Sequence, residues 1–309
     1  MKRKYYCICL LVLCITVMAG CSKEKDNTTD SLQVTYNVNS GFLEGAGINF
    51  QIDDENAAVA GICDMDIDEI EVPDKINYEN KDYPVVKVIS SAFESDTSIV
   101  SFKAGDNITE IEDSAFYSCD TLKTIDLNNT VKIIGADAFG GCSDLKEVKG
   151  AGALTSISDN AFSACYSLEY IFISKNVESM GIEIFSDCEG LKKCDLEEGL
   201  TFIGQGMFTN CTNLSDISIP KSVTTINEEA FWGCSAIKEL ELPESLVVIG
   251  DKAFYDTEIK TLKLPEGITG IKFDMLDGMS ELESITVPSS KESMYKEQFD
   301  EYGIDINVY

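Results

Sequence analysis

Residues 214–234 read LSDISIPKSVTTINEEAFWGC, and this pattern recurs through most of the chain. Its general form is Leu-x-x-Ile-x-Ile-Pro-x-x-Val-x-x-Ile-Gly-x-x-Ala-Phe-x-x-Cys. The phenylalanine of the pattern recurs every 23 residues, at Phe93, Phe116, Phe139, Phe162, Phe185, Phe208, Phe231 and Phe254. Leu276 takes its place in the last unit, after 22 residues. A fixed period of this length is typical of a solenoid, in which each unit is too small to bury a core alone and stacks on its neighbours. The period therefore predicts a single elongated rod.

The first part of each unit suits a short strand, because its apolar residues alternate, as in Ile217 and Ile219. Proline follows the strand in four units, as at Pro220. Proline ends a strand because it fixes φ and lacks the amide hydrogen of a ladder donor. The Val-x-x-Ile and Ala-Phe segments then return the chain across the core. We expect one short strand per 23-residue coil and a parallel sheet on one face of the rod.

These units resemble the BspA-type leucine-rich repeats of bacterial surface proteins, through the Ile-Pro and Ala-Phe-x-x-Cys signatures over about residues 65–290. The resemblance implies a repeat solenoid of the leucine-rich-repeat type, a right-handed superhelix with a parallel β-sheet on one face. The terminal units depart from the pattern, with Asp96 and Thr257 in place of cysteine and Leu276 in place of phenylalanine. Such departures are expected at the ends of a solenoid, because an end coil has only one neighbour.

The amino terminus, residues 1–20, has the pattern of a secretory signal peptide: a basic start, an apolar run and small residues before Cys21. The Ala-Gly-Cys ending resembles a bacterial lipobox, which implies cleavage before Cys21 and lipidation of that cysteine. Acyl chains there would anchor the protein to a membrane. The alternatives are an uncleaved anchor and an ordinary secretory cut. Residues 21–31 are polar and predict a flexible tether.

The segments on either side of the repeats are expected to cover the ends of the core. Residues 32–84 are typical of a β-rich N-terminal cap that includes a modified first coil. Residues 85–288 form the predicted leucine-rich-repeat solenoid, and residues 289–309 form the predicted C-terminal cap. In the C-terminal cap, a polar stretch suits a short helix and an alternating stretch at 304–308 suits a closing strand.

The chain is strongly acidic, with 24 Lys and Arg residues against 54 Asp and Glu residues and a formal net charge of −30. Such a chain repels nucleic acid and anionic membrane surfaces, so we expect no nucleic-acid partner. The excess acid either forms a solvated surface or steers cations and basic partners. At the outward strand positions, however, lysines and acids nearly balance. Pairing of opposite charges across strands is the structural explanation for this balance.

Outward strand positions also supply the candidate binding face. Tyr170 and Phe172 lie on one strand in the middle of the array, and exposed aromatics are common anchors at protein interfaces. The alternative is that they stabilise the sheet surface without a partner. A binding surface needs a face without the excess negative charge of the rest of the chain, and the strand face meets this condition. Four lysines complete the candidate binding face: Lys146, Lys149, Lys192 and Lys193.

Twelve cysteines in an exported chain first suggest disulfides. Six of them, however, occupy one site in successive coils, and cysteine is among the most buried residue types. We therefore predict a column of buried thiols, although coils about 4.8 Å apart also lie within disulfide range. Cys63 and Cys194 are expected to be further core positions. The column consists of Cys119, Cys142, Cys165, Cys188, Cys211 and Cys234.

No pattern in the chain predicts catalysis. The sequence has no histidine, which removes the usual general base and imidazole metal ligands. It also has no Walker loop, dinucleotide glycine pattern or zinc spacing. We expect no catalytic residue, no metal site and no cofactor.

A lipid-anchored solenoid without a catalytic pattern is expected to act by binding. The resemblance to the BspA-type family implies adhesion to host or other bacterial surface components, through a protein or glycan ligand. We expect the protein in the bacterial cell envelope, at the outer membrane and exposed on the outer surface. The alternative is a periplasmic or envelope scaffold that docks a partner of the same cell.

Overall fold

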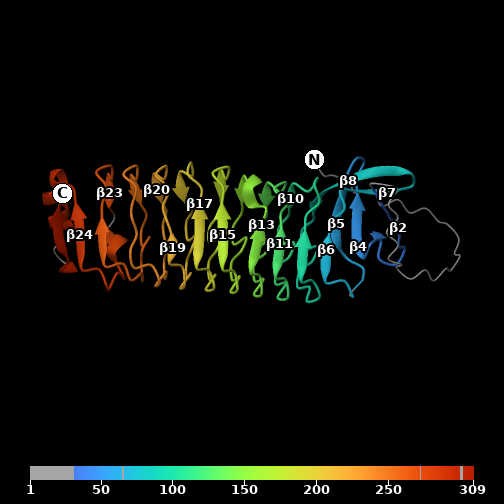
Figure 1. The fold of residues 1–309 in the computed structure, drawn as a ribbon, viewed down its shortest axis with the longest axis horizontal. Coiled ribbons are helices and arrows are strands. Elements are labelled where there is room, and N and C mark those ends of the chain that lie inside the picture. Colours follow the sequence, from blue (N-terminus) through green and yellow to red (C-terminus); the bar gives the residue numbers. More distant parts are fainter. Residues whose placement is uncertain (1–30, 65, 272, 300–301) are drawn as a thin grey trace.

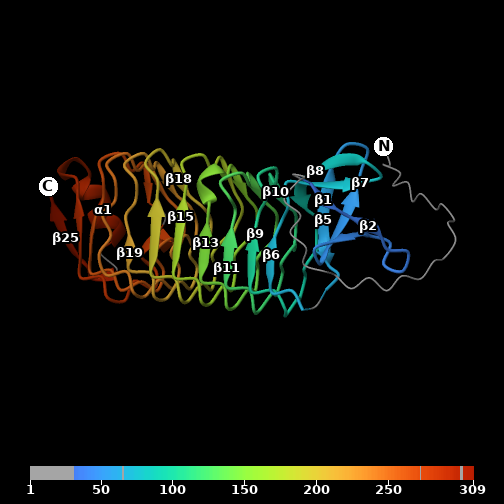
Figure 2. The same ribbon diagram turned by 45° about the vertical axis from the view of Figure 1, so that its right-hand side comes forward.

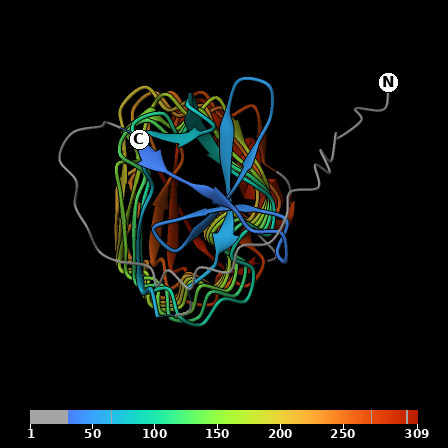
Figure 3. The ribbon, with the colours of Figure 1, turned by 90° about the vertical axis from the view of Figure 1, so that its right-hand side faces the viewer.

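The computed structural model describes residues 31–64, 66–271, 273–299 and 302–309. They form a rod of stacked coils (Figure 1). Views turned by 45° and along the rod show coils of similar outline lying side by side (Figures 2 and 3). The apolar side chains inside them make one continuous core. The predicted signal peptide and Cys21 lie outside the described residues.

One face of the rod carries a row of short parallel strands, which we call the first row. Its strands are β6 (Glu69–Glu71), β9 (Ser101–Lys103), β11 (Thr124–Asp126), β13 (Glu147–Lys149), β15 (Tyr170–Ile173), β17 (Lys193–Leu196), β19 (Asp216–Ile217), β22 (Thr261–Lys263), β24 (Ser284–Val287) and β25 (Asp305–Val308). Neighbouring strands within the repeats pair one repeat apart, so that Ile125 lies beside Val148. The first row is divided into three sheets, β6-β9-β11-β13, β15-β17-β19 and β22-β24-β25.

Most coils contribute a second, shorter strand, so the confirmed solenoid has two strands per coil along much of its length rather than the single strand expected. The Val-x-x-Ile segment forms this second row, in which Ile134 of one coil pairs with Ile157 of the next. Two extended residues suffice for a parallel ladder, and so short a segment has no strand pattern of its own. The second row consists of β8 (Lys81–Val88), β10 (Glu110–Ile111), β12 (Ile133–Ile134), β14 (Ser156–Ile157), β16 (Ser179–Met180), β18 (Phe202–Ile203), β20 (Thr225–Ile226), β21 (Val248–Ile249) and β23 (Gly270–Ile271).

Strands in mostly antiparallel pairs cover the N-terminal end of the core. They are β1 (Leu32–Gln33), β2 (Thr35–Tyr36), β3 (Leu43–Gly45), β4 (Ile48–Ile52), β5 (Ala57–Ile62) and β7 (Lys75–Tyr78). Strand β1 pairs in parallel with β7. Strands β2 to β5 pair in sequence order and β5 joins β8, so this cap continues the second row. Strands β7 and β8 form a hairpin in the segment that separates the first coil from the next.

The C-terminal end contains both the helix and the strand that the sequence suggested. Helix α1 (Glu292–Phe299) follows a 3-10 turn, η3 (Ser289–Lys291), and another 3-10 turn, η2 (Phe273–Leu276), lies in the preceding coil. Tyr295 and Phe299 of α1 are buried in the core. Strand β25 pairs with β24 and extends the first row.

The repeated phenylalanines form a continuous stack inside the rod. From Phe93 to Phe254 the ring centroids of neighbours lie 4.7–5.9 Å apart, with interplanar angles of 11–19°. From Phe93 to Phe231, the backbone amide of the aromatic residue also donates to the next coil, as from Phe162 to the Ile184 carbonyl at 2.9 Å. Each coil is thus held to its neighbour by ring contacts and by a backbone hydrogen bond at the same point.

The predicted column of buried thiols lies beside this stack. Each of the six thiols donates to the carbonyl oxygen of the phenylalanine in the preceding coil, with sulfur–oxygen distances of 2.9–3.3 Å. Among the described cysteines none forms a disulfide, and Cys194 is buried as expected. The expectation for Cys63 is wrong. Cys63 is exposed because it follows the last residue of β5, in a bend outside the core.

Burial of the thiol column should make the free energy of unfolding decrease at alkaline pH. Burial raises the pKa of Cys119 from the ordinary 9.0 to about 12. A thiol of the unfolded chain therefore loses its proton near pH 9, whereas the buried thiol keeps it, so the free energy of unfolding falls as pH rises above 9. The Cys119 thiol therefore contributes a slope of about 1.4 kcal/mol per pH unit between pH 9 and 12.

The substitution Cys119→Thr should make this slope shallower, and Thr257→Cys should make it steeper. Thr257 occupies the column position in its own coil and is buried there, with its hydroxyl donating to the Phe254 carbonyl at 2.8 Å. The measurement is denaturant unfolding from pH 7 to 10.5 under reducing conditions. Identical slopes in the two variants and the unsubstituted protein would contradict burial of the column.

Candidate functional site

The first row is interrupted next to a glycine that occupies a core position. The third inward position of each strand segment is apolar in neighbouring coils, as at Leu127 and Ile173, but it is Gly150 in the coil between them. Gly150 has a φ of +69° and leads into the 3-10 turn η1 (Ala151–Ala153). Strand β13 ends at Lys149, just as β11 ends at the equivalent Asp126, whereas β15 continues one residue further to Ile173.

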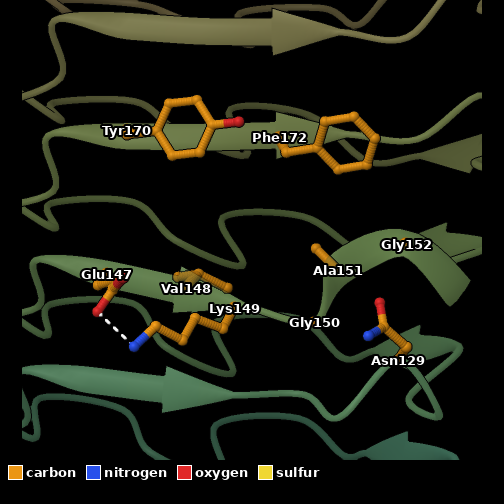
Figure 4. Close-up of a pocket in the computed structure, with 9 residues that line it drawn as sticks. All are labelled: Asn129, Glu147, Val148, Lys149, Gly150, Ala151, Gly152, Tyr170 and Phe172. Atoms are coloured by element: carbon orange, nitrogen blue, oxygen red, sulfur yellow. Dashed lines mark ion pairs between the residues drawn. The ribbon is translucent and has the colours of Figure 1, made fainter.

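An open hollow, which we call the notch, lies on the strand face between β13 and β15. Strand β13 pairs with β11, and β15 pairs with β17, but no ladder joins β13 to β15 among the described residues. The hollow between them has a volume of about 310 Å³. Its lining, drawn in Figure 4, consists of Asn129, Glu147, Val148, Lys149, Gly150, Ala151, Gly152, Tyr170 and Phe172.

Two aromatic side chains of β15 form one wall of the notch. Tyr170 is 39 % exposed and Phe172 is half-buried. They point to the same side of the strand because they are two residues apart. The Tyr170 hydroxyl donates to the Asp195 carboxylate on β17 at 2.9 Å. Partial burial and this hydrogen bond raise the pKa of Tyr170, so the phenol stays protonated and the ring is held in place.

The charged side chains near the notch are paired with one another. Lys149 Nζ lies 2.9 Å from Glu147 Oε2 on the same strand. On β17, beyond the aromatic wall, Lys193 Nζ lies 3.3 Å from Asp195 Oδ1 and 3.5 Å from Asp216 Oδ2. The notch therefore lies in a locally neutral part of a very acidic protein.

The predicted candidate binding face is thus divided by the structure. Tyr170, Phe172 and Lys149 line the notch. Lys146 is exposed just before β13, outside the lining. Lys192 and Lys193 belong to the next coil, where Lys192 pairs with Glu169 at 3.3 Å. The aromatic wall of the notch was predictable from the sequence, whereas the contributions of Asn129, Gly150 and Gly152 were not. Glycine at an otherwise apolar strand position is the signal that could have found them.

Ion pairs follow the same strand face toward the C-terminal end. Lysines pair with acids of a neighbouring strand or turn at 3.2–3.7 Å. All of these side chains are substantially exposed, and exposed pairs typically contribute at most about 1 kcal/mol each. Their main effect is to keep the strand face nearly neutral. The pairs are Lys238–Glu258, Lys260–Glu283 and Lys263–Glu244.

The described residues offer neither a metal site nor a membrane-spanning helix. No group of three or more Cys, Asp or Glu side chains in this part of the chain is arranged to hold a metal ion. None of the helices in the described segments is both long enough and apolar enough to cross a membrane.

Comparison with known proteins agrees with the geometry of the coils. The family described as the BspA type leucine-rich repeat region matches residues 86–215 and 201–306, with six copies. The chain belongs to this family. No curated protein matches it.

Solved structures of bacterial leucine-rich repeat proteins share the fold of this BspA-type protein. A leucine-rich repeat protein from Bacteroides ovatus aligns with a TM-score of 0.69 and 23 % identity, over 85 % of this chain and 75 % of that one. A leucine-rich cell surface protein from Faecalibacterium prausnitzii aligns with a TM-score of 0.55 and 23 % identity, over 86 % and 94 % of the two chains. At these identities the likeness supports the fold alone.

Substitution of Gly150 should destabilise the protein. A Cβ on Gly150 would lie 2.5 Å from the Asn128 amide nitrogen and 2.8 Å from that of Asn129, and the positive φ adds strain. We expect Gly150→Ala to cost about 1–3 kcal/mol of unfolding free energy. The control is Gly152→Ala, where the added Cβ would meet only the exposed Asn129 side chain at 3.1 Å. Denaturant unfolding of both variants is the measurement, and equal stability would contradict this role of Gly150.

Proposed function

We propose that this BspA-type protein is a lipid-anchored binding protein of the bacterial cell surface. It contacts host or other bacterial surface components through the first-row strand face, and it has no catalytic role. Lipid on Cys21 and a polar tether hold the solenoid away from the membrane. Membership of the BspA-type family and the fold shared with a leucine-rich cell surface protein support this proposal.

The observation that carries the proposal is the notch, with its partly exposed aromatic wall on a neutral face. Aromatic side chains are enriched at the centres of interfaces, and charged residues are depleted there. The Glu147–Lys149 and Lys193–Asp195 pairs remove net charge from the surroundings of Tyr170. A partner therefore meets apolar ring surface without long-range repulsion from this face, whereas the acidic remainder of the protein disfavours contact with other acidic surfaces.

The double substitution Tyr170→Ser and Phe172→Ser should weaken attachment to ligand-bearing surfaces. We expect the amount of protein needed for half-maximal binding to rise about tenfold or more, because both ring contacts are lost. The measurement is binding of the full-length protein, in mild detergent, to immobilised host matrix proteins, mucins and bacterial envelope extracts. The matched control is Tyr117→Ser, which removes a tyrosine of 41 % exposure outside the notch. Equal loss in both variants would contradict a contact role for the notch.

Replacement of Cys21 should release the protein from the membrane. We expect Cys21→Ala to move the protein from the membrane fraction to the soluble fraction or the medium, because the acyl chains would be absent. The measurement is immunoblotting of cell fractions.

Display on the cell surface is tested separately, by protease added to intact cells that carry the unsubstituted protein. Loss of the protein under these conditions supports surface exposure. Full protection would favour a periplasmic scaffold instead.

A further inference from the structure

We propose that the notch binds a neutral sugar ring of a glycan. This inference rests on the proposed function of the strand face as a contact surface and names the class of ligand that the face takes. It follows from three properties of the notch: a flat aromatic wall, internally compensated charges, and polar groups without bulky neighbours.

The aromatic wall is suited to stacking. Figure 4 shows the rings of Tyr170 and Phe172 lying flat along β15, both seen face-on. The hydrogen bond from the Tyr170 hydroxyl to Asp195 holds the tyrosine ring in this orientation. The face of an aromatic ring is electron-rich, and it attracts the weakly positive C–H groups on the apolar side of a sugar ring. Two such faces in a row provide a platform for one or two sugar units.

The charges around the notch favour an uncharged ligand. The Glu147 carboxylate that lines the notch is 2.9 Å from the Lys149 ammonium, so neither group offers a free charge to an ion. A sulfated or sialylated ligand would also be repelled by the acidic protein as a whole. A basic peptide would have to break the Glu147–Lys149 pair or compete with Tyr170 for Asp195. A neutral sugar requires neither change.

The remaining wall supplies hydrogen-bonding groups and space. The exposed side chain of Asn129 has both a donor and an acceptor, and Figure 4 shows it beside the turn that contains Ala151 and Gly152. This turn consists of glycine and alanine, and its Gly152 carbonyl already accepts a hydrogen bond from the Asn176 side chain at 3.0 Å. The polar side chain that lines the hollow on this wall is therefore Asn129. The volume of about 310 Å³ lies at the small end of the range of roughly 300–1,000 Å³ for small-molecule sites. It suits a sugar unit better than a large protein segment.

The experiment is binding of the full-length protein, in mild detergent, to an array of neutral oligosaccharides of hexoses and N-acetylhexosamines. The array also carries sialylated and sulfated forms and an arginine-rich peptide. We expect saturable binding to at least one neutral oligosaccharide, little dependence on salt, and no preference for the charged probes.

Two variants act on the notch in different ways. Phe172→Ala removes a ring that has no hydrogen bond of its own, and Gly152→Gln adds uncharged bulk where only the Asn129 side chain lies within 4 Å. Each should weaken neutral-glycan binding at least tenfold, whereas Tyr117→Ser should leave it unchanged. Circular dichroism and thermal unfolding of each variant separate a loss of binding from a loss of folding.

Several outcomes would overturn the proposal. They are the absence of neutral-glycan binding, neutral-glycan binding that survives both notch variants, and notch-dependent binding of only the peptide or the charged glycans. If the Tyr170→Ser and Phe172→Ser protein loses attachment to host or envelope surfaces but no neutral glycan binds, the sugar inference fails and the proposed function stands. If the unsubstituted protein binds neither surfaces nor glycans, both fail.

Discussion

Stacking of one coil on the next, at a spacing fixed by the repeated phenylalanine, is the constraint on which the rest of the structure depends. The rings from Phe93 to Phe254 contact their neighbours at 4.7–5.9 Å, and amide and thiol hydrogen bonds join the coils at the same place. A side chain therefore meets its counterpart 23 residues away along most of the array. Stability accumulates from neighbour to neighbour, and the outer surface stays free to vary without disturbing the core.

The notch shows how a local departure from the repeat can create a site. Gly150 lacks the side chain that Leu127 and Ile173 contribute to the core, and its left-handed backbone leads into the turn η1. The ladder between β13 and β15 is lost there. The ring stack continues beneath it, with Phe139 and Phe162 only 5.2 Å apart. The core thus tolerates an interruption of the surface sheet, because the coils are held together from inside as well as along the strands.

Much of the fold was predictable from the sequence because period, inward face and column positions all follow from a 23-residue spacing. Features that depend on local backbone geometry were not predictable from the sequence. The second strand row comes from segments of two residues, too short for an alternating pattern. Cys63 resembled a core position by residue type, but it lies in a bend beyond the end of β5. Tyr170 and Phe172 were identifiable as outward residues, whereas the hollow beside them depended on the backbone conformation of Gly150.

Neutrality of the strand face also has a structural origin, and it bears on how binding would occur. Lysines and acids of adjacent coils meet in register, so their charges cancel across the first row, whereas the chain as a whole carries a formal net charge of −30. A small, open and uncharged notch offers ring contacts and a few hydrogen bonds, which makes a single contact weak. Under the proposed lipid anchoring, many copies share one membrane, and several weak contacts to a repeating glycan could act together. Such avidity can exceed the affinity of one site by about 10²–10⁴, so a weak notch is compatible with firm adhesion.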